Sequence, residues 1–390
     1  MTTQLLEAPD WGGRLRRAGL WLLAGGLVAV SLVFSTATQD QFELPKQLLL
    51  RALSSLMLGL LLAGLLCGDP PAWRRTPLDL PVLAWSLWLL ACTVHSISPA
   101  ISWRGEYENF AGSLTQLNYS AVFFITVQWA GRKDGARTLA RAVLAAATGA
   151  ALYASAQALQ RDLIQWSAKS IISDRFFGPL GNPNFLAGLM AMAIPLKLAL
   201  AAAEQRDAAP RDREQAWRWA LLAVWVLAYV AKGQAALLNP FLARPGASLA
   251  AGLLLLLWLA SLCLEPLLRL RGRARAGHLV AQGADLLLYL GVLANTGTRG
   301  GFLGLMLGLA ALLAGWLWTH RKDGASALRL FNTAVLGLAV LVLGLSALVA
   351  ALGPSFRTRM VASLSNPALA YENSRREIWE PAVHIWMDHP

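Results

Sequence analysis

Long apolar runs separated by short polar connections dominate this sequence. Each run holds enough consecutive apolar residues to cross about 30 Å of hydrocarbon as an α-helix rising about 1.5 Å per residue. The runs lack the polar face of an amphipathic surface helix, so lipid is the solvent that suits them. The pattern predicts about eleven transmembrane helices, at roughly 18–36, 48–66, 78–96, 113–130, 138–159, 180–203, 217–235, 247–265, 279–296, 300–319 and 328–352.

These runs predict an all-α fold, a polytopic transmembrane helical bundle. Residues 1–352 are expected to form one transmembrane domain, and 353–390 to begin an extracytoplasmic loop. Between Ile378 and Trp386 the apolar residues recur at helical spacing, which predicts a short amphipathic helix at the membrane interface. The sequence contains no recognisable internal repeat and no soluble domain.

Composition and charge agree with a membrane protein. Of the 390 residues, 56% are hydrophobic and only 14% are charged, and the mean hydropathy is +0.49. The net charge of +12 comes from basic clusters between the apolar runs, where such clusters record orientation. The connections between spans fall alternately on the two sides of the membrane. The set on the same side as the amino terminus is richer in Lys and Arg, and it includes the connection 206–218 with Arg218. This bias predicts a cytoplasmic amino terminus and argues against nucleic acid binding.

The sequence lacks the motifs of several classes of enzyme. There is no phosphate-binding GxxxxGK[ST] loop, no HExxH and no CxxC, so neither ATP hydrolysis nor zinc chemistry is expected. Cys67, Cys92 and Cys263 are isolated within or beside apolar runs, where a thiol acts as a small hydrophobe. We expect no metal and no cofactor.

The first candidate site is the segment 174–184, which leads into an apolar run on the expected outer side. An Asn beside the proline can cap the following helix, whose positive dipole end and unpaired N–H groups would then face outward. Glycines would allow an anion to approach closely, and the guanidinium group of an Arg could donate two hydrogen bonds to a phosphate. A plain turn with a snorkelling Arg explains the segment equally well. The candidate binding residues are Arg175, Gly178, Gly181, Asn182 and Asn184.

Two further polar segments lie on the same expected side. In 295–301, Arg299 and Gly300 open the next helix among small residues. Two glycine-rich helix starts that each carry an Arg could together hold the two phosphates of a pyrophosphate. In 374–386, Arg375 and its neighbour Arg376 could serve the same anion or merely solvate one face of the amphipathic helix.

At these segments the sequence resembles the superfamily of O-antigen ligases and polymerases, which are polytopic bacterial membrane glycosyltransferases. The resemblance rests on 175–184, 298–301 and 374–390, in this order, with a weaker similarity at 104–112. It implies transfer of a glycan from a polyprenyl-pyrophosphate carrier to a hydroxyl of a glycan, lipid or protein acceptor. It also implies action at the periplasmic face of the bacterial inner membrane, in the biosynthesis of lipopolysaccharide and related cell-envelope glycans, without metal or cofactor.

The resemblance assigns roles to several residues. Arg175 and Arg299 would grip the donor pyrophosphate, and Arg375 would help to shape the outer loop. The general base of the family is a His that activates the acceptor hydroxyl, and it belongs to a part of the loop beyond the end of this sequence. Neither His384 nor His389 occupies its place in the motif, so the catalytic residue is unassigned.

Two other functions are compatible with the sequence. A transporter or flippase for a lipid-linked or anionic solute would need ionisable residues within the membrane, and Lys197 and Asp285 are the obvious internal candidates. An inactive fragment or structural membrane component would lack the terminal part that the resemblance implies. The sequence does not identify the sugar, the acceptor or the oligomeric state.

Overall fold

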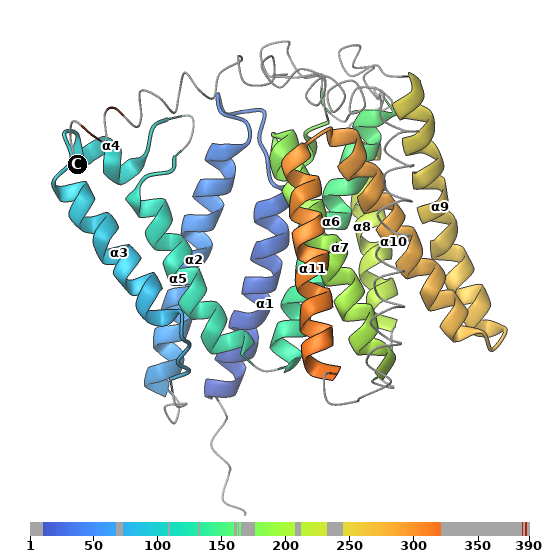
Figure 1. Ribbon diagram of the computed structural model, residues 1–390, viewed down its shortest axis with the longest axis horizontal. Coiled ribbons are helices and arrows are strands. Elements are labelled where there is room, and N and C mark those ends of the chain that lie inside the picture. The colour runs from blue at the N-terminus through green and yellow to red at the C-terminus, as the bar shows by residue number, and fades with distance from the viewer. Residues whose placement is uncertain are drawn as a thin grey trace, which may run out of the picture.

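The structure, a computed structural model, describes residues 11–67, 73–107, 110–131, 133–159, 162, 164, 176–206, 212–231, 245–320, 384 and 387. These residues form helices and connecting turns, with no β-strand in the described part of the chain. Figure 1 shows most of the helices running up and down one bundle. The helices are α1 (Trp11–Leu32), α2 (Glu43–Cys67), α3 (Asp79–Val94), α4 (Pro99–Arg104), α5 (Ser113–Ala130), α6 (Lys133–Ala158), α7 (Pro183–Arg206), α8 (Asp212–Ala231), α9 (Pro245–Leu270), α10 (Ala274–Thr296) and α11 (Arg299–His320), with a 3-10 turn η1 (Gly178–Leu180) before α7.

Each predicted span from 18–36 to 300–319 coincides with a helix. Within the described ranges seven helices are long and apolar enough to cross a membrane, namely α1, α2, α6, α7, α9, α10 and α11. Helix α3 is apolar but has only 16 residues, and α5 and α8 contain several polar residues. The predicted span 328–352 and the segment 353–390 lie outside the described residues, apart from His384 and Met387. The apolar helices thus indicate a membrane protein, and the described residues do not confirm the predicted count of about eleven spans.

The helices alternate in direction, because short connections join neighbours that run antiparallel. One end of the bundle carries α4 and the first residues of α2, α5, α7 and α11, and it is at the top of Figure 1. We call it the upper end. The lower end carries the start of α1 and the turn between α9 and α10. Both glycine-rich segments of the sequence, 178–184 and 298–301, therefore lie at the upper end.

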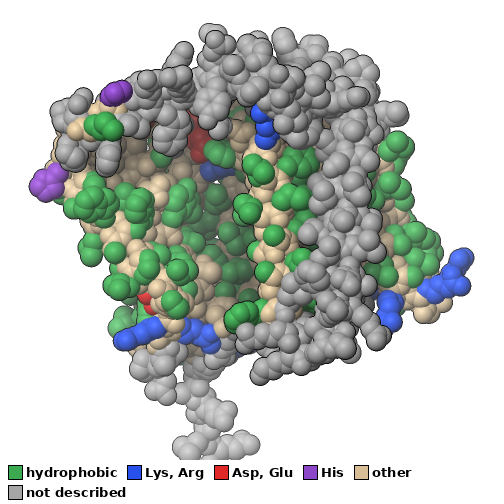
Figure 2. Space-filling view, viewed as in Figure 1, with side chains coloured by type: hydrophobic (Ala, Val, Ile, Leu, Met, Phe, Trp, Pro, Cys, Tyr) green, Lys and Arg blue, Asp and Glu red, His purple; other side chains and the backbone are tan. Residues whose placement is uncertain are grey.

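The largest buried core lies between α6, α7, α9, α10 and α11. Alanines of α6 such as Ala147, Ala150 and Ala151 are fully buried there, and small residues of this kind let membrane helices approach closely. The outer faces of the helices are apolar instead, as the hydrophobic side chains across the middle of Figure 2 show. This arrangement puts large hydrophobic side chains where lipid would meet them.

Candidate functional site

The turn before α7 adopts backbone conformations that favour glycine. Gly178 and Gly181 have φ angles of +59° and +75°. A side-chain carbon at Gly181 would collide with the ring of Phe42, and one at Gly178 would lie 3.3 Å from Leu186 Cδ1. Conformation and packing thus account for both glycines without a ligand, and their role toward an anion stays a prediction.

Buried polar side chains at the end of α6 hold this turn in place. The backbone N–H of Gly178 donates to Gln157 Oε1 at 3.0 Å. Gln157 Nε2 in turn donates to Asp162 Oδ2 at 3.1 Å, and the Tyr153 hydroxyl donates to Asp162 Oδ1 at 2.6 Å. Since Gln157 and Asp162 are fully buried, this chain of hydrogen bonds fixes the turn firmly against α6.

Lys46, in the first turn of α2, adds a cation beside the same turn. Its Nζ donates to the carbonyl oxygen of Pro179 at 2.8 Å and lies 5.2 Å from the centroid of the Phe42 ring. Lys46 was not singled out from the sequence. Nothing in its neighbours predicted the contact, because α2 and the turn are joined by tertiary packing.

The start of α7 has the predicted cap, which leaves few backbone N–H groups of its first turn available to a ligand. Asn182 Oδ1 accepts the N–H of Asn184 at 2.8 Å, and the Asn182 carbonyl accepts the N–H of Leu186 at 3.1 Å. Pro183 has no N–H to offer. The first turn of α7 therefore presents fewer unpaired N–H groups than the sequence predicted.

The start of α11 lies directly beside the start of α7. The Thr298 hydroxyl donates to Asn184 Oδ1 at 3.3 Å and lies 3.5 Å from the Pro183 carbonyl oxygen. Arg299 and Gly300, the first residues of α11, are exposed, and apart from the chain neighbours and backbone of α11 no atom lies within 4 Å of where a side-chain carbon would sit at Gly300. We call Asn182–Pro183–Asn184 together with Thr298–Arg299–Gly300 the paired helix starts. They bring the first two candidate segments together.

The remaining predicted site residues are not placed. Arg175 and Arg375 lie outside the described residues. The weaker similarity at 104–112 falls partly inside them and borders a cavity of about 370 Å³ at the upper end, between α3, α4 and α5. Its lining includes hydroxyl, amide and carboxylate side chains, among them Ser102, Glu106 and Gln116.

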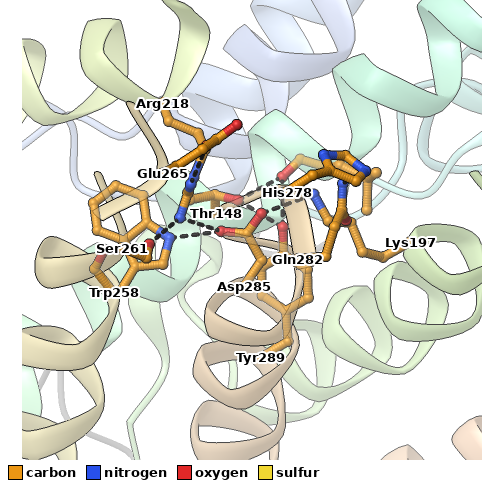
Figure 3. Close-up of polar contacts among 11 residues, drawn as sticks. Thr148, Lys197, Arg218, Trp258, Ser261, Glu265, His278, Gln282, Asp285 and Tyr289 are labelled. Atoms are coloured by element: carbon orange, nitrogen blue, oxygen red, sulfur yellow. Dashed lines mark hydrogen bonds and ion pairs between the residues drawn. The ribbon is translucent and has the colours of Figure 1, made fainter. Parts of the chain in front are cut away.

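A second polar centre lies within the bundle, where α7, α8, α9 and α10 meet (Figure 3). Lys197 Nζ is 2.8 Å from Asp285 Oδ2, and Arg218 Nη2 is 3.2 Å from Asp285 Oδ1. The indole N–H of Trp258 also donates to Asp285 Oδ1, at 2.7 Å. Lys197, Arg218 and Asp285 expose 1% or less of their side chains, so these charges are balanced by each other instead of by water.

The pairing continues toward the lower end through Glu265. Its Oε2 is 3.5 Å from Arg218 Nη1, and its Oε1 is 2.7 Å from Arg269 Nη2. Only Arg269 is partly exposed, with 23% of its side chain accessible. We call Lys197, Arg218, Glu265 and Asp285 the buried ion network.

The network corrects the sequence analysis at Arg218, which was counted in a cytoplasmic connection. Helix α8 begins at Asp212, so Arg218 lies inside it and is completely buried. Lys197 and Asp285 were recognised because each interrupts an apolar run. Arg218 and Glu265 were missed because they fall at the edges of the predicted spans, where charge is ordinary.

No metal centre accompanies either polar region: the described residues contain no group of three or more His, Cys, Asp or Glu able to hold a metal ion. Comparison of the chain with known protein families, with curated proteins and with solved structures finds no match. The class that the fold itself defines is an all-helical protein whose apolar helices suit a lipid bilayer.

Proposed function

We propose that this protein is a membrane glycosyltransferase of the O-antigen ligase type. It transfers a glycan from a polyprenyl-pyrophosphate carrier to an acceptor hydroxyl at the outer face of the bacterial inner membrane. The observation that carries the proposal is the contact of Thr298 with Asn184, because it joins the two segments that the resemblance assigns to one donor.

The paired helix starts suit a pyrophosphate leaving group. Arg299 is exposed beside the open surface at Gly300, at the positive dipole end of α11. Because Asn184 Oδ1 accepts from Thr298, its amide Nδ2 remains as a donor beside them. As the oxygen of the acceptor hydroxyl bonds to the anomeric carbon, the carbon–oxygen bond to pyrophosphate breaks and the hydroxyl proton is released to solvent. The Arg299 cation stabilises the charge that develops on the leaving group.

The acceptor needs a place at the same end of the bundle. The cavity between α3, α4 and α5 is within the size range of small-ligand sites, and its hydroxyl, amide and carboxylate side chains could bind a polyhydroxyl group against an otherwise apolar lining. Helix α2 links it to the turn before α7, since Lys46 contacts Pro179 while the adjacent Gln47 accepts a hydrogen bond from Thr115 of α5.

The distribution of basic side chains supports an extracytoplasmic upper end. Arg271, Arg273 and Arg275 are exposed in and beside the turn between α9 and α10, and Arg14 and Arg17 are exposed near the start of α1. These positions are all at the lower end, and Figure 2 shows Lys and Arg side chains along that edge. Since basic residues stay in the cytoplasm, the proposal places the amino terminus there and the paired helix starts outside.

Replacing Arg299 tests the proposed function. In cells that carry Arg299→Ala in the chromosomal gene, glycan transfer should fall about a hundredfold, because a cation at the leaving group is lost. Arg271→Ala, which removes an exposed Arg at the opposite end, is the matched control and should leave transfer unchanged. The measurement is the surface-glycan profile, with the amount of protein in the membrane determined for each variant. Normal transfer by Arg299→Ala would overturn the proposal.

The buried ion network favours transport as a second candidate function. Ionisable residues inside membrane helices often mark the path of an ion or a proton. Reconstituted vesicles distinguish the two functions, because a transporter moves solute or lipid-linked glycan across the bilayer without forming a new glycosidic bond.

A further inference from the structure

The ion pair between Lys197 and Asp285 joins the two helices that lead to the paired helix starts. Lys197 belongs to α7, which begins at Pro183, and Asp285 belongs to α10, which ends two residues before Thr298. Both side chains are buried, and Figure 3 shows them approaching each other from the two helices. These two segments therefore touch at two polar contacts. Thr298 meets Asn184 at the upper end, and Lys197 meets Asp285 inside the bundle.

The two contacts are spaced equally along the chain. Asn184 precedes Lys197 by the same number of residues, 13, as Asp285 precedes Thr298. At about 1.5 Å per helical residue, the stretch of α7 spans roughly 20 Å, while the stretch from Asp285 follows α10 to Thr296 and then the turn at Gly297. Because α7 and α10 run in opposite directions, equal spacing means that one register of α7 against α10 satisfies both contacts.

Apolar packing alone selects this register weakly. Lipid tails are as apolar as leucine, so the hydrophobic effect gives membrane helices little reason to prefer one apolar contact over another. A slide by one helical turn, about 5.4 Å, would exchange similar Ala and Leu contacts. The same slide would separate Lys197 Nζ from Asp285 Oδ2, now 2.8 Å apart, and remove a buried cation from its anion.

We infer that Lys197 and Asp285 are positioning residues that set the register of α7 against α10 and so hold the start of α11 against the start of α7. The use of this arrangement for a pyrophosphate rests on the proposed function. The register itself does not, since it follows from the ion pair and its spacing from the helix starts.

Of the two residues of the ion pair, Lys197 is the better one to substitute in a test, because Asp285 has other partners in the network. Asp285 also pairs with Arg218 and accepts a hydrogen bond from Trp258, so it remains partnered when Lys197 loses its charge. Lys197→Met thus releases α7 without leaving Asp285 unpaired. Replacing Asp285 would instead deprive both Lys197 and Arg218 of an anion, and it would disturb more than the register.

A pair of engineered cysteines reports the position of α7. A side-chain carbon at Gly304 of α11 would lie 3.7 Å from Ala191 Cβ of α7, which is within the range of a disulfide. After Cys67, Cys92 and Cys263 are changed to Ser, Ala191→Cys with Gly304→Cys should cross-link readily in membranes. Adding Lys197→Met should lower the cross-linked fraction by at least about threefold, because a one-turn slide exceeds disulfide geometry. Lys197→Arg keeps the charge and should restore it.

A second cysteine pair is the matched control. The hydroxyl oxygens of Ser86 in α3 and Ser120 in α5 are 3.0 Å apart, remote in sequence from α7, so Ser86→Cys with Ser120→Cys should cross-link in every background. Equal cross-linking of the 191/304 pair with and without Lys197→Met would overturn the inference. Loss of the control cross-link in Lys197→Met would also overturn it, because the ion pair would then stabilise the bundle as a whole.

Glycan transfer is measured in parallel on Lys197→Met and Lys197→Arg. Loss of transfer in Lys197→Met and its recovery in Lys197→Arg are the results expected from positioning. If the 191/304 cross-link falls while transfer persists, the register role stands and the proposed use of the paired helix starts fails. The cross-link needs no glycan donor, so the two failures remain distinguishable.

Discussion

At the scale of single residues, Thr298 makes the contact that joins the two parts of the proposed site. Its hydroxyl is the only part of the side chain that distinguishes it from valine in shape and chemistry, and it contacts both Asn184 and the Pro183 carbonyl. Asn184 in turn depends on Asn182 for the cap of α7. A small set of neutral polar groups thus joins two helices that carry the candidate chemistry.

Thr298→Val should weaken this junction while preserving the side-chain volume. Loss of the hydroxyl leaves Asn184 Oδ1 without its donor, so we expect the unfolding free energy to fall by about 1 kcal/mol. Thermal unfolding of the detergent-purified protein measures the effect, and glycan transfer should decline with it. Thr298→Ser retains the hydroxyl and should behave like the unchanged protein; equal loss in both variants would contradict the role of the hydrogen bond.

At the scale of helices, glycines determine how closely α11 approaches α7. A side-chain carbon at Gly301 would lie 2.7 Å from Ala187 Cβ and 2.9 Å from Leu293 Cδ1, whereas one at the adjacent Gly300 would meet nothing within 4 Å. Two neighbouring glycines therefore have different roles. Gly301 permits helix contact, and Gly300 leaves open surface beside Arg299.

Gly301→Ala and Gly300→Ala should separate these roles. The first forces α11 away from α7 and should lower the unfolding free energy by about 1–3 kcal/mol, as overpacking does. The second should keep or slightly raise stability, because alanine favours a helix over glycine. Thermal unfolding of the two variants in one detergent compares them directly. Equal stability of both would mean that α7 and α11 are not packed as described.

Helix positions were largely predictable from the sequence, whereas the polar contacts between helices were not. The apolar runs located α1, α2, α6, α7, α9, α10 and α11 because burial in lipid depends on local composition. The cap by Asn182 was predictable for the same reason, since it involves neighbouring residues. Arg218 looked like a connection residue, and only the packing of α8 revealed that it reaches Asp285.

At the scale of the whole molecule, the two ends of the bundle differ in chemistry. The upper end has the glycine-rich turn, the paired helix starts and the cavity beside α4, while the lower end has exposed Arg side chains in the turn between α9 and α10. The buried ion network lies between the ends and extends through Arg269 toward the lower one. The proposed reaction requires the upper end to be extracytoplasmic.

Single cysteines should confirm this orientation in intact cells. In the chain without native cysteines, Gly300→Cys is expected to react with a membrane-impermeant maleimide from outside, because the described residues of the upper end carry no cluster like Arg271, Arg273 and Arg275 at the lower end. Gly272→Cys, in the turn between α9 and α10, should react only after the membrane is permeabilised. Both positions are exposed, so accessibility alone does not separate them. The reverse labelling pattern would place the helix starts in the cytoplasm and contradict the proposed function.

The sequence by itself determined that the chain forms apolar helices suited to a bilayer, and it marked two glycine-rich helix starts with their Arg and Asn residues. These are local properties, because solvation by lipid and helix capping depend on residues close together in the chain. Only the tertiary structure decided that Asn184 meets Thr298, 114 residues away, and that Lys197 meets Asp285. Such pairs join residues that lie far apart in the chain, so no local sequence pattern predicts them and only the packing of the helices brings them together.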